Sequence, residues 1–157
     1  MDELLGQVPV FGELSAEHRA TISGCGRNQV FQPDAYLMRE GDPAELFYVI
    51  REGTVALETF VPQRGAVTLQ TLHGGDLLGW SWLFPPYRTA FDGRALDTVH
   101  ALQFDGTCLR GKSDSDPSLG YDLLKLFAAV IIQRLQHTRL QLLDLYAESP
   151  AATPGRT

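Results

Sequence analysis

Short runs of alternating apolar and polar residues fill the middle of the chain, and glycine or proline separates each run from the next. Such runs predict β-strands, because alternate side chains of a strand face opposite sides of a sheet. The predicted strands are residues 29–31, 36–39, 46–52, 54–60, 67–72 and 94–104. Residues 61–66 form the clearest hairpin loop. Short strands at this spacing favour a β-sandwich or a jelly-roll barrel.

Helical patterns precede and follow the predicted strands. Residues 2–24 have a helical pattern, with Ser15 as a good N-cap and Glu17 placed to favour the helix dipole. Asp105 is the expected N-cap of a short helix within residues 105–116. The pattern therefore predicts an α+β domain, in which N-terminal helices, an antiparallel jelly roll and C-terminal helices follow one another.

The longest predicted element is a helix over about residues 117–146. Asp116 and Pro117 form a strong start signal, because proline is well tolerated at the first helical position. Apolar residues then recur at alternating spacings of four and three, which is the pattern of a heptad seam. The seam consists of Leu124, Ala128, Ile131, Leu135, Thr138, Leu142 and Leu145.

A second apolar stripe runs along only the first half of this helix, at Leu123, Phe127 and Val130. We expect the stripe to pack on the chain's own barrel, and the seam to pair with the same helix of a second copy in a homodimer. A single amphipathic helix lying across its own barrel is the alternative. Residues 1–147 then form one domain, and the small, proline-rich residues 148–157 predict a disordered tail.

Length and charge limit the function classes. With 157 residues, the chain fits one domain with a single core. A net charge of −6 argues against a large binding surface for nucleic acid or for an anionic membrane. The N-terminus lacks the apolar core of a signal peptide, and no run reaches the length of a membrane span. We therefore expect a cytoplasmic protein.

The two cysteines, Cys25 and Cys108, stand in unrelated local contexts. Two cysteines without a motif are typical of free thiols in a reducing compartment. A disulfide is possible, but nothing in the sequence suggests one. We therefore expect both thiols to be free.

Residues suited to catalysis or metal binding are scattered. The four histidines, His18, His73, His100 and His137, are isolated, with no His-x-His pair and no carboxylate at ligand spacing. Neither cysteine has a catalytic motif around it, and no Ser-His-Asp arrangement has a defined context. We expect no metal site and no enzymatic activity.

One stretch, residues 75–95, combines glycine, apolar and basic positions in a way that suggests chemistry. It predicts a turn and a short apolar helix that must stop at Pro85-Pro86. Arg88 then stands at the start of the next predicted strand. Free N–H groups at a helix start favour an anion, and a guanidinium pairs well with phosphate oxygens. The stretch therefore predicts a site for a small anion, in the first place a phosphate.

Five segments of the chain carry a family likeness: 31–42 (FQPDAYLMREGD), 47–57 (FYVIREGTVAL), 75–79 (GDLLG), 88–90 (RTA) and 134–139 (RLQHTR). Together they resemble cyclic nucleotide-binding domains, in particular the sensor half of Crp/Fnr-type regulators, over about residues 8–146. The resemblance implies a jelly roll followed by a dimer-forming helix. It also implies a cyclic nucleotide, cyclic AMP or cyclic GMP, or another small phosphorylated ligand.

The output domain of such regulators is a helix-turn-helix after the long helix, and this chain ends shortly after that helix. We therefore expect no contact with nucleic acid or membrane. The regulatory signal is then expected to pass through an unidentified protein partner or through the dimer itself.

The resemblance assigns roles to positions in the stretch. In the family, backbone N–H groups at the start of the short helix hold the cyclic phosphate, and here they belong to Gly79, Trp80 and Ser81. Arg88 matches the arginine that pairs with the phosphate, and Thr89 matches a hydroxyl residue near the phosphate or purine. The alternatives are a surface salt bridge from Arg88 to an aspartate, Asp92 or Asp97, and an ordinary strand position for Thr89.

Trp80 departs from the family pattern. The family has a glutamate after the loop glycine, which accepts the ribose 2′-hydroxyl, whereas indole has one donor and no acceptor. Losing that hydrogen bond costs about 1.5–3 kcal/mol, on the order of ten- to a hundredfold in affinity. Trp80 either takes the place of ribose or fills the core beneath a pocket that binds nothing. In the second case the domain is a constitutive dimerisation or interaction module. Trp82 is expected in the core.

Thr138 is the one polar residue of the seam. In relatives that respond to cyclic AMP, a hydroxyl on the long helix meets the purine, so the resemblance implies that Thr138 contacts the ligand. A polar seam residue can equally fix the register of two helices without a ligand. Arg139 stands where a second small hydroxyl residue is expected and, like Trp80, indicates an altered site.

Overall fold

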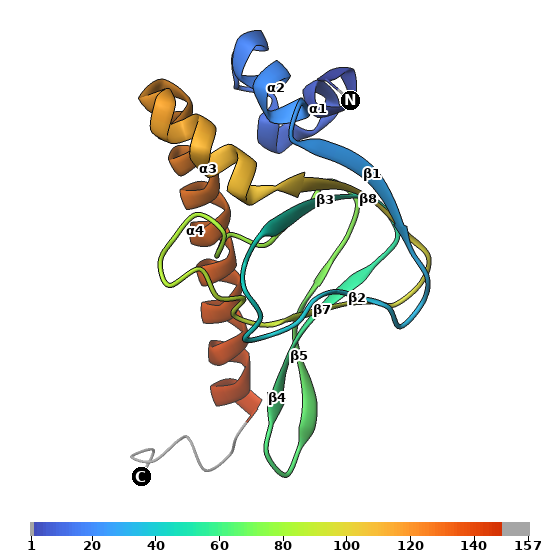
Figure 1. Cartoon of the computed structure of the whole chain (residues 1–157). Coiled ribbons are helices and arrows are strands. Elements are labelled where there is room, and N and C mark those ends of the chain that lie inside the picture. The colour runs from blue at the N-terminus through green and yellow to red at the C-terminus, as the bar shows by residue number, and fades with distance from the viewer. Residues whose placement is uncertain (1, 149–157) are drawn as a thin grey trace, which may run out of the picture.

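The computed structural model describes residues 2–148 (Figure 1), and the rest of the predicted tail lies outside them. The helical elements are α1 (Asp2–Gln7), the 3₁₀ turn η1 (Pro9–Phe11), α2 (Ala16–Ser23), α3 (Gly106–Ser115) and α4 (Pro117–Glu148). The strands are β1 (Gly26–Phe31), β2 (Tyr36–Met38), β3 (Leu46–Glu52), β4 (Val55–Val61), β5 (Gly65–Leu72), β6 (Leu77–Leu78), β7 (Asp92–Ala95) and β8 (Val99–Asp105).

The strands form two four-stranded antiparallel sheets, ordered β1-β8-β3-β6 and β2-β7-β4-β5. The sheets enclose an apolar interior, and helices stand at both ends of the strand series, so the predicted α+β jelly-roll fold is confirmed. The β4–β5 hairpin turns within the predicted loop and extends beside the second half of α4 (Figure 1). There the Gln141 side-chain amide donates to the Leu69 carbonyl, 3.0 Å away.

The predicted strand over residues 94–104 is two strands in different sheets, β7 and β8. The chain bends at residues 96–98 because two hydrogen bonds to Thr54 hold it there. Leu96 N–H donates to the Thr54 carbonyl at 2.9 Å, and Thr54 N–H donates to the Asp97 carboxylate at 2.7 Å. The prediction of one strand was wrong because the alternation of apolar and polar residues does not show where the chain passes from one sheet to the other.

The predicted helix caps are confirmed. The Ser15 and Asp105 side chains cap α2 and α3, each accepting from the N–H three residues further on, at 3.1 and 3.0 Å. The Asp116 side chain accepts from Ser118 N–H at the start of α4. These short-range contacts set where the helices begin.

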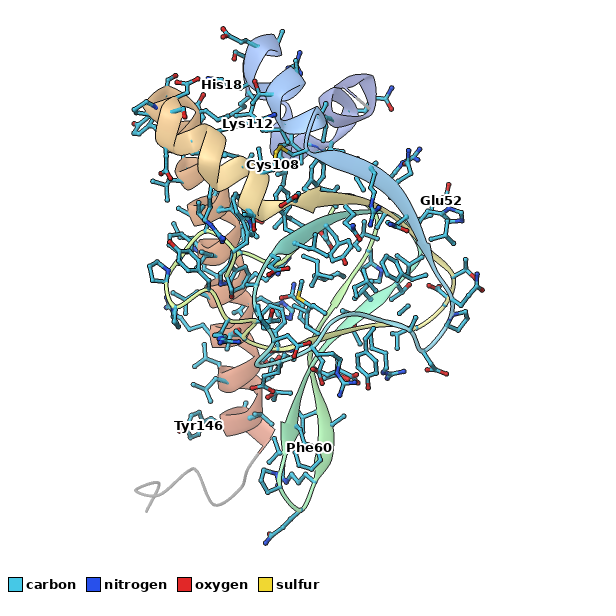
Figure 2. All side chains as sticks on the ribbon, in the orientation of Figure 1. His18, Glu52, Phe60, Cys108, Lys112 and Tyr146 are labelled. Atoms are coloured by element: carbon cyan, nitrogen blue, oxygen red, sulfur yellow. A yellow bond between two sulfur atoms is a disulfide. The ribbon has the colours of Figure 1, made fainter. Side chains whose placement is uncertain are left out.

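Cys25 and Cys108 form a disulfide, contrary to the expectation of free thiols (Figure 2). Their Cα atoms lie 6.2 Å apart although 83 positions separate them in the sequence. The pairing of β1 with β8 places Gly26 opposite Phe104, and this brings the residue before β1 next to the first turn of α3. The prediction was wrong because local context does not reveal a contact made by strand pairing.

A cluster of four fully buried aromatic rings joins the barrel to α4. Phe47 stacks on Trp82 and on Phe104, with ring centroids 5.0 and 4.7 Å apart. Phe127 of α4 meets Phe47 and Trp82 edge-on, at 5.2 Å from each centroid. The expected core position of Trp82 is confirmed, and the cluster anchors the first half of α4 on the barrel.

The predicted stripe of α4 behaves as expected. Leu123, Phe127 and Val130 are buried against the protein's own core. A polar contact adds to this anchor, because His18 Nδ1 of α2 lies 2.7 Å from an Asp122 carboxylate oxygen. The first half of α4 is therefore held by both the barrel and the N-terminal helices.

Phe127→Ala is expected to lower the free energy of unfolding by about 3–5 kcal/mol, because it removes the ring that joins α4 to the barrel. Urea unfolding followed by circular dichroism measures this. Gln136→Ala, at an exposed position of the same helix, is the control and is expected to change the value by less than about 0.5 kcal/mol. Equal losses in the two variants would contradict the anchoring role.

Candidate functional site

The stretch from residue 79 to residue 91 forms turns, and the predicted short helix is absent from this described segment. Leu83 N–H donates to the Trp80 carbonyl at 3.1 Å, and Tyr87 N–H donates to the Phe84 carbonyl at 3.0 Å. The prediction was wrong because Pro85-Pro86 lacks N–H donors and leaves too few residues after Gly79 to nucleate a helix. No helix N-terminus is therefore present in this segment to hold an anion.

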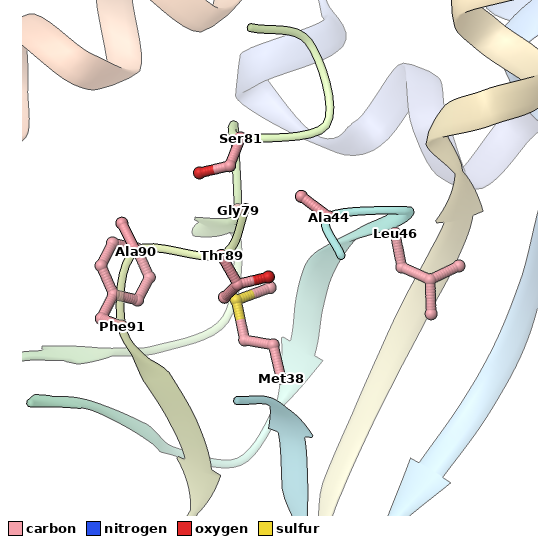
Figure 3. Close-up of a pocket in the computed structure, with 8 residues that line it drawn as sticks. All are labelled: Met38, Ala44, Leu46, Gly79, Ser81, Thr89, Ala90 and Phe91. Atoms are coloured by element: carbon pink, nitrogen blue, oxygen red, sulfur yellow. The ribbon is translucent and has the colours of Figure 1, made fainter. Parts of the chain in front are cut away.

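Three of the predicted phosphate residues, Gly79, Ser81 and Thr89, line one small pocket (Figure 3). Its volume is about 10 Å³, much less than that of a usual small-molecule site. Met38 limits the space, because a Cβ at Gly79 would lie 2.9 Å from the Met38 methyl carbon. Gly79 also has a φ of +97°, which favours glycine. The three residues therefore come together around a small, tight space.

Arg88 is exposed and does not line this pocket. Its backbone pairs with Pro43 in an isolated bridge. The alternative salt bridges are also not formed, because Asp92 lies 3.5 Å from Arg39 and Asp97 accepts the Thr54 N–H. The structure therefore leaves the Arg88 guanidinium without an ion pair among residues 2–148. Thr89, next to it, is buried.

A larger pocket of about 280 Å³ lies between the barrel and α4. Its lining comes from both parts: Leu57, Leu69, Gln70, Trp80 and Phe91 of the barrel, and Ile131, Arg134, Leu135 and Thr138 of α4. The volume is close to the lower end of the usual range for small-molecule sites. Trp80 and Thr138 are the two predicted ligand residues that this pocket brings together.

Trp80 forms one wall of the larger pocket. Its ring meets Phe91 edge-on with 5.6 Å between the centroids, and the Arg134 guanidinium carbon lies 5.3 Å from the Trp80 ring centroid. The Trp80 side chain is half-buried and also packs on both core clusters. The Trp80 ring therefore contributes to the core and also presents surface to the larger pocket.

Arg134 is the charged residue of this lining, and it was not among the predicted site residues. Its Nη2 donates to the Leu77 carbonyl, and its Nη1 is buried without an acceptor among residues 2–148. Burial lowers the pKa of Arg134 well below its usual value, to about 10, and the nearby Asp76 carboxylate offsets part of this lowering. A lowering of this size corresponds to about 3 kcal/mol against the charged form.

Thr138 lies one helical turn beyond Arg134, and its hydroxyl donates to the Arg134 carbonyl at 2.9 Å. That proton is therefore used, and the hydroxyl lone pairs remain as acceptors. Arg139 is exposed and lines neither pocket. The spacing of four between Arg134 and Thr138, which puts both on one helix face, is the signal that could have identified Arg134.

Histidines and helices bear on two other function classes, metal binding and membrane insertion. Within residues 2–148, no group of three or more histidine, cysteine or acidic side chains could hold a metal ion. His18 has Asp122 at 2.7 Å from Nδ1, and Asp116 and Ser118 at 3.9 and 3.5 Å from Nε2, a cluster that the sequence did not reveal. In the same part of the chain, none of the helices combines the length and apolarity that a membrane crossing requires.

Known proteins with similar sequences or structures identify the family of this chain. The profile of the cyclic nucleotide-binding domain matches residues 28–116, more than half of the chain. A search of curated proteins finds no match.

Solved structures have the same fold. A candidate cyclic nucleotide-binding protein from Geobacter metallireducens has a TM-score of 0.76 at 26% identity, covering 85% of this chain and 97% of that one. The N-terminal domain of a transcriptional regulator from Streptomyces coelicolor has a TM-score of 0.66 at 27% identity, with coverages of 88% and 94%. For the catabolite activator protein of Thermus thermophilus the TM-score is 0.67 at 20% identity, with coverages of 87% and 62%. The chain belongs to the cyclic nucleotide-binding domain family, a regulatory class of domain.

Proposed function

We propose that the protein is a dimeric regulatory domain that senses a small molecule in the pocket between the barrel and α4. The observation that carries this proposal is the mixed lining of the pocket, with Trp80 and Phe91 on the barrel side and Arg134 and Thr138 on α4. A ligand there contacts both parts, so its binding free energy can shift α4 relative to the barrel. A protein partner then responds to the position of α4.

Family membership makes a cyclic nucleotide the first ligand to test. The flat face of a purine suits the aromatic wall formed by Trp80 and Phe91. The Thr138 hydroxyl keeps its lone pairs for an N–H donor of the base. The phosphate has less support, because Met38 restricts the pocket at Gly79 to about 10 Å³. Binding in the family's manner requires Met38 to move.

The homodimer is supported by the exposure of the seam. Leu124, Leu135, Leu142 and Leu145 are 45%, 64%, 51% and 65% exposed in the single chain. Apolar residues at heptad spacing on an exposed helix face are stabilised when a second copy of the helix covers them. Thr138 belongs both to the seam and to the pocket lining, so the proposed interface lies beside the ligand.

A constitutive dimerisation module is the second candidate function. It is favoured by the closed pocket at Gly79 and by the exposed Arg88, the two positions where the resemblance places the phosphate. In this case the seam forms the dimer, and the larger pocket has no role in regulation. The two candidates differ in whether a small molecule binds.

Calorimetric titration with cyclic AMP and cyclic GMP tests the sensing function. We expect weak binding, and Trp80→Glu is expected to raise the affinity by about ten- to a hundredfold, because the glutamate accepts the ribose hydroxyl. Gln70→Glu adds the same charge at another position of the pocket lining and is expected to give no gain. Unchanged or weaker binding by Trp80→Glu would contradict this account of Trp80. If neither the natural sequence nor any variant binds nucleotide at millimolar concentration, the dimerisation module is favoured.

Light scattering at micromolar concentration tests the dimer. We expect the mass of two chains for the natural sequence and of one chain for Leu142→Glu, because the substitution places a charge in the apolar seam. Leu143→Glu changes the neighbouring residue, which is 57% exposed and lies outside the seam, and is expected to remain a dimer. A monomer mass for the natural sequence would refute the interface.

A further inference from the structure

Arg134 gives the larger pocket a positive charge with incomplete hydrogen bonding. One guanidinium nitrogen, Nη2, donates to the Leu77 carbonyl. The other, Nη1, is buried and has no acceptor among residues 2–148, and no carboxylate in this part of the chain forms an ion pair with the side chain. A buried donor on a charged group is costly when it is left unpaired, and an anion that reached it would bind strongly.

Asp76 is the acidic residue whose charge acts on Arg134, but its carboxylate does not accept a hydrogen bond from the guanidinium. It lies close enough to raise the pKa of Arg134 in part, and both residues line a neighbouring cavity of about 80 Å³. However, its carboxylate accepts the His73 N–H at 2.8 Å, and the two side chains form no ion pair within 4.0 Å. Part of the guanidinium charge therefore remains available to a ligand.

The rest of the larger pocket is mainly apolar. Six of its side chains are hydrocarbon or aromatic: Leu57, Leu69, Trp80, Phe91, Ile131 and Leu135. The polar ones are Gln70 and Thr138, and Thr138 already donates its proton to the helix backbone. With one guanidinium and one amide as its donors, this lining suits a singly charged anion such as a carboxylate better than a phosphate dianion.

We propose that the ligand of this pocket is an organic acid with an apolar, aromatic body, with its carboxylate paired with the Arg134 guanidinium and its ring against Trp80 and Phe91. This inference rests on the proposed sensing function and narrows its ligand class. Trp80 then contributes ring surface, against which the guanidinium also packs, and offers no carboxylate that would compete with the ligand. A glutamate at position 80 would compete with the ligand, because the Trp80 ring lies 5.3 Å from the Arg134 guanidinium carbon.

The test is calorimetric titration of the full chain with benzoate, 2-naphthoate, indole-3-acetate and decanoate, each beside its uncharged amide. We expect an aromatic acid to bind and its amide to bind at least about tenfold more weakly. Arg134→Met is expected to weaken binding of the acid by about ten- to a hundredfold and to leave binding of the amide unchanged. Its melting temperature is not expected to fall, because the variant removes a buried charge that lacks full pairing.

Two variants control the result. Arg139→Met removes an exposed arginine of the same helix that lies outside the pocket, and acid binding is expected to be unchanged. Trp80→Glu supplies an internal carboxylate and is expected to abolish acid binding even as cyclic nucleotide affinity rises. This second variant tests the Arg134 pairing independently if Arg134→Met does not fold.

The outcomes separate the two proposals. Equal binding of an acid and its amide, or equal acid binding by Arg134→Met and the natural sequence, would overturn the acid proposal. Cyclic nucleotide binding without binding of any acid would overturn it too, and would leave the proposed sensing function standing. Binding of neither class would overturn both.

Discussion

The packing of Phe127 against Phe47 and Trp82 fixes how the long helix lies on the barrel. An α-helix is a rigid rod, so one anchored turn determines where the turns beyond it lie. Arg134 and Thr138 follow Phe127 by about two and three turns, and their positions over the pocket depend on that anchor. The anchor in turn depends on Gly106, where a Cβ would lie 2.7 Å from the Trp82 Cβ.

Patterns made by neighbours in the sequence predicted the fold well. The caps at Ser15 and Asp105 and the buried stripe through Phe127 each depend on residues a few positions apart. The errors concern contacts between distant segments. The Cys25–Cys108 disulfide follows from strand pairing across 83 positions, and the bend before β8 depends on Thr54 in the turn between β3 and β4.

The site was predicted in part, for the same reason. Trp80 was identified because it departs from a pattern, and the structure places it in the lining of the larger pocket. Arg134 was missed because an arginine on a helix is usually a solvated charge, and its burial depends on the Leu77 carbonyl of the barrel. The likeness to the family directed attention to Arg88, which is exposed, whereas the cation of the larger pocket comes from α4.

The buried charge of Arg134 also gives the proposed sensing a direction. Burial disfavours the charged form of Arg134, so without an anion this residue weakens the packing of its part of α4 on the barrel. An acid paired with Arg134 would offset part of this cost, and the same close approach would then be less unfavourable. Because Thr138 lies in both the pocket and the seam, α4 cannot move toward the barrel without changing the proposed dimer interface. In the proposed mechanism the ligand therefore favours the state in which α4 packs on the barrel, and its binding changes the proposed dimer interface.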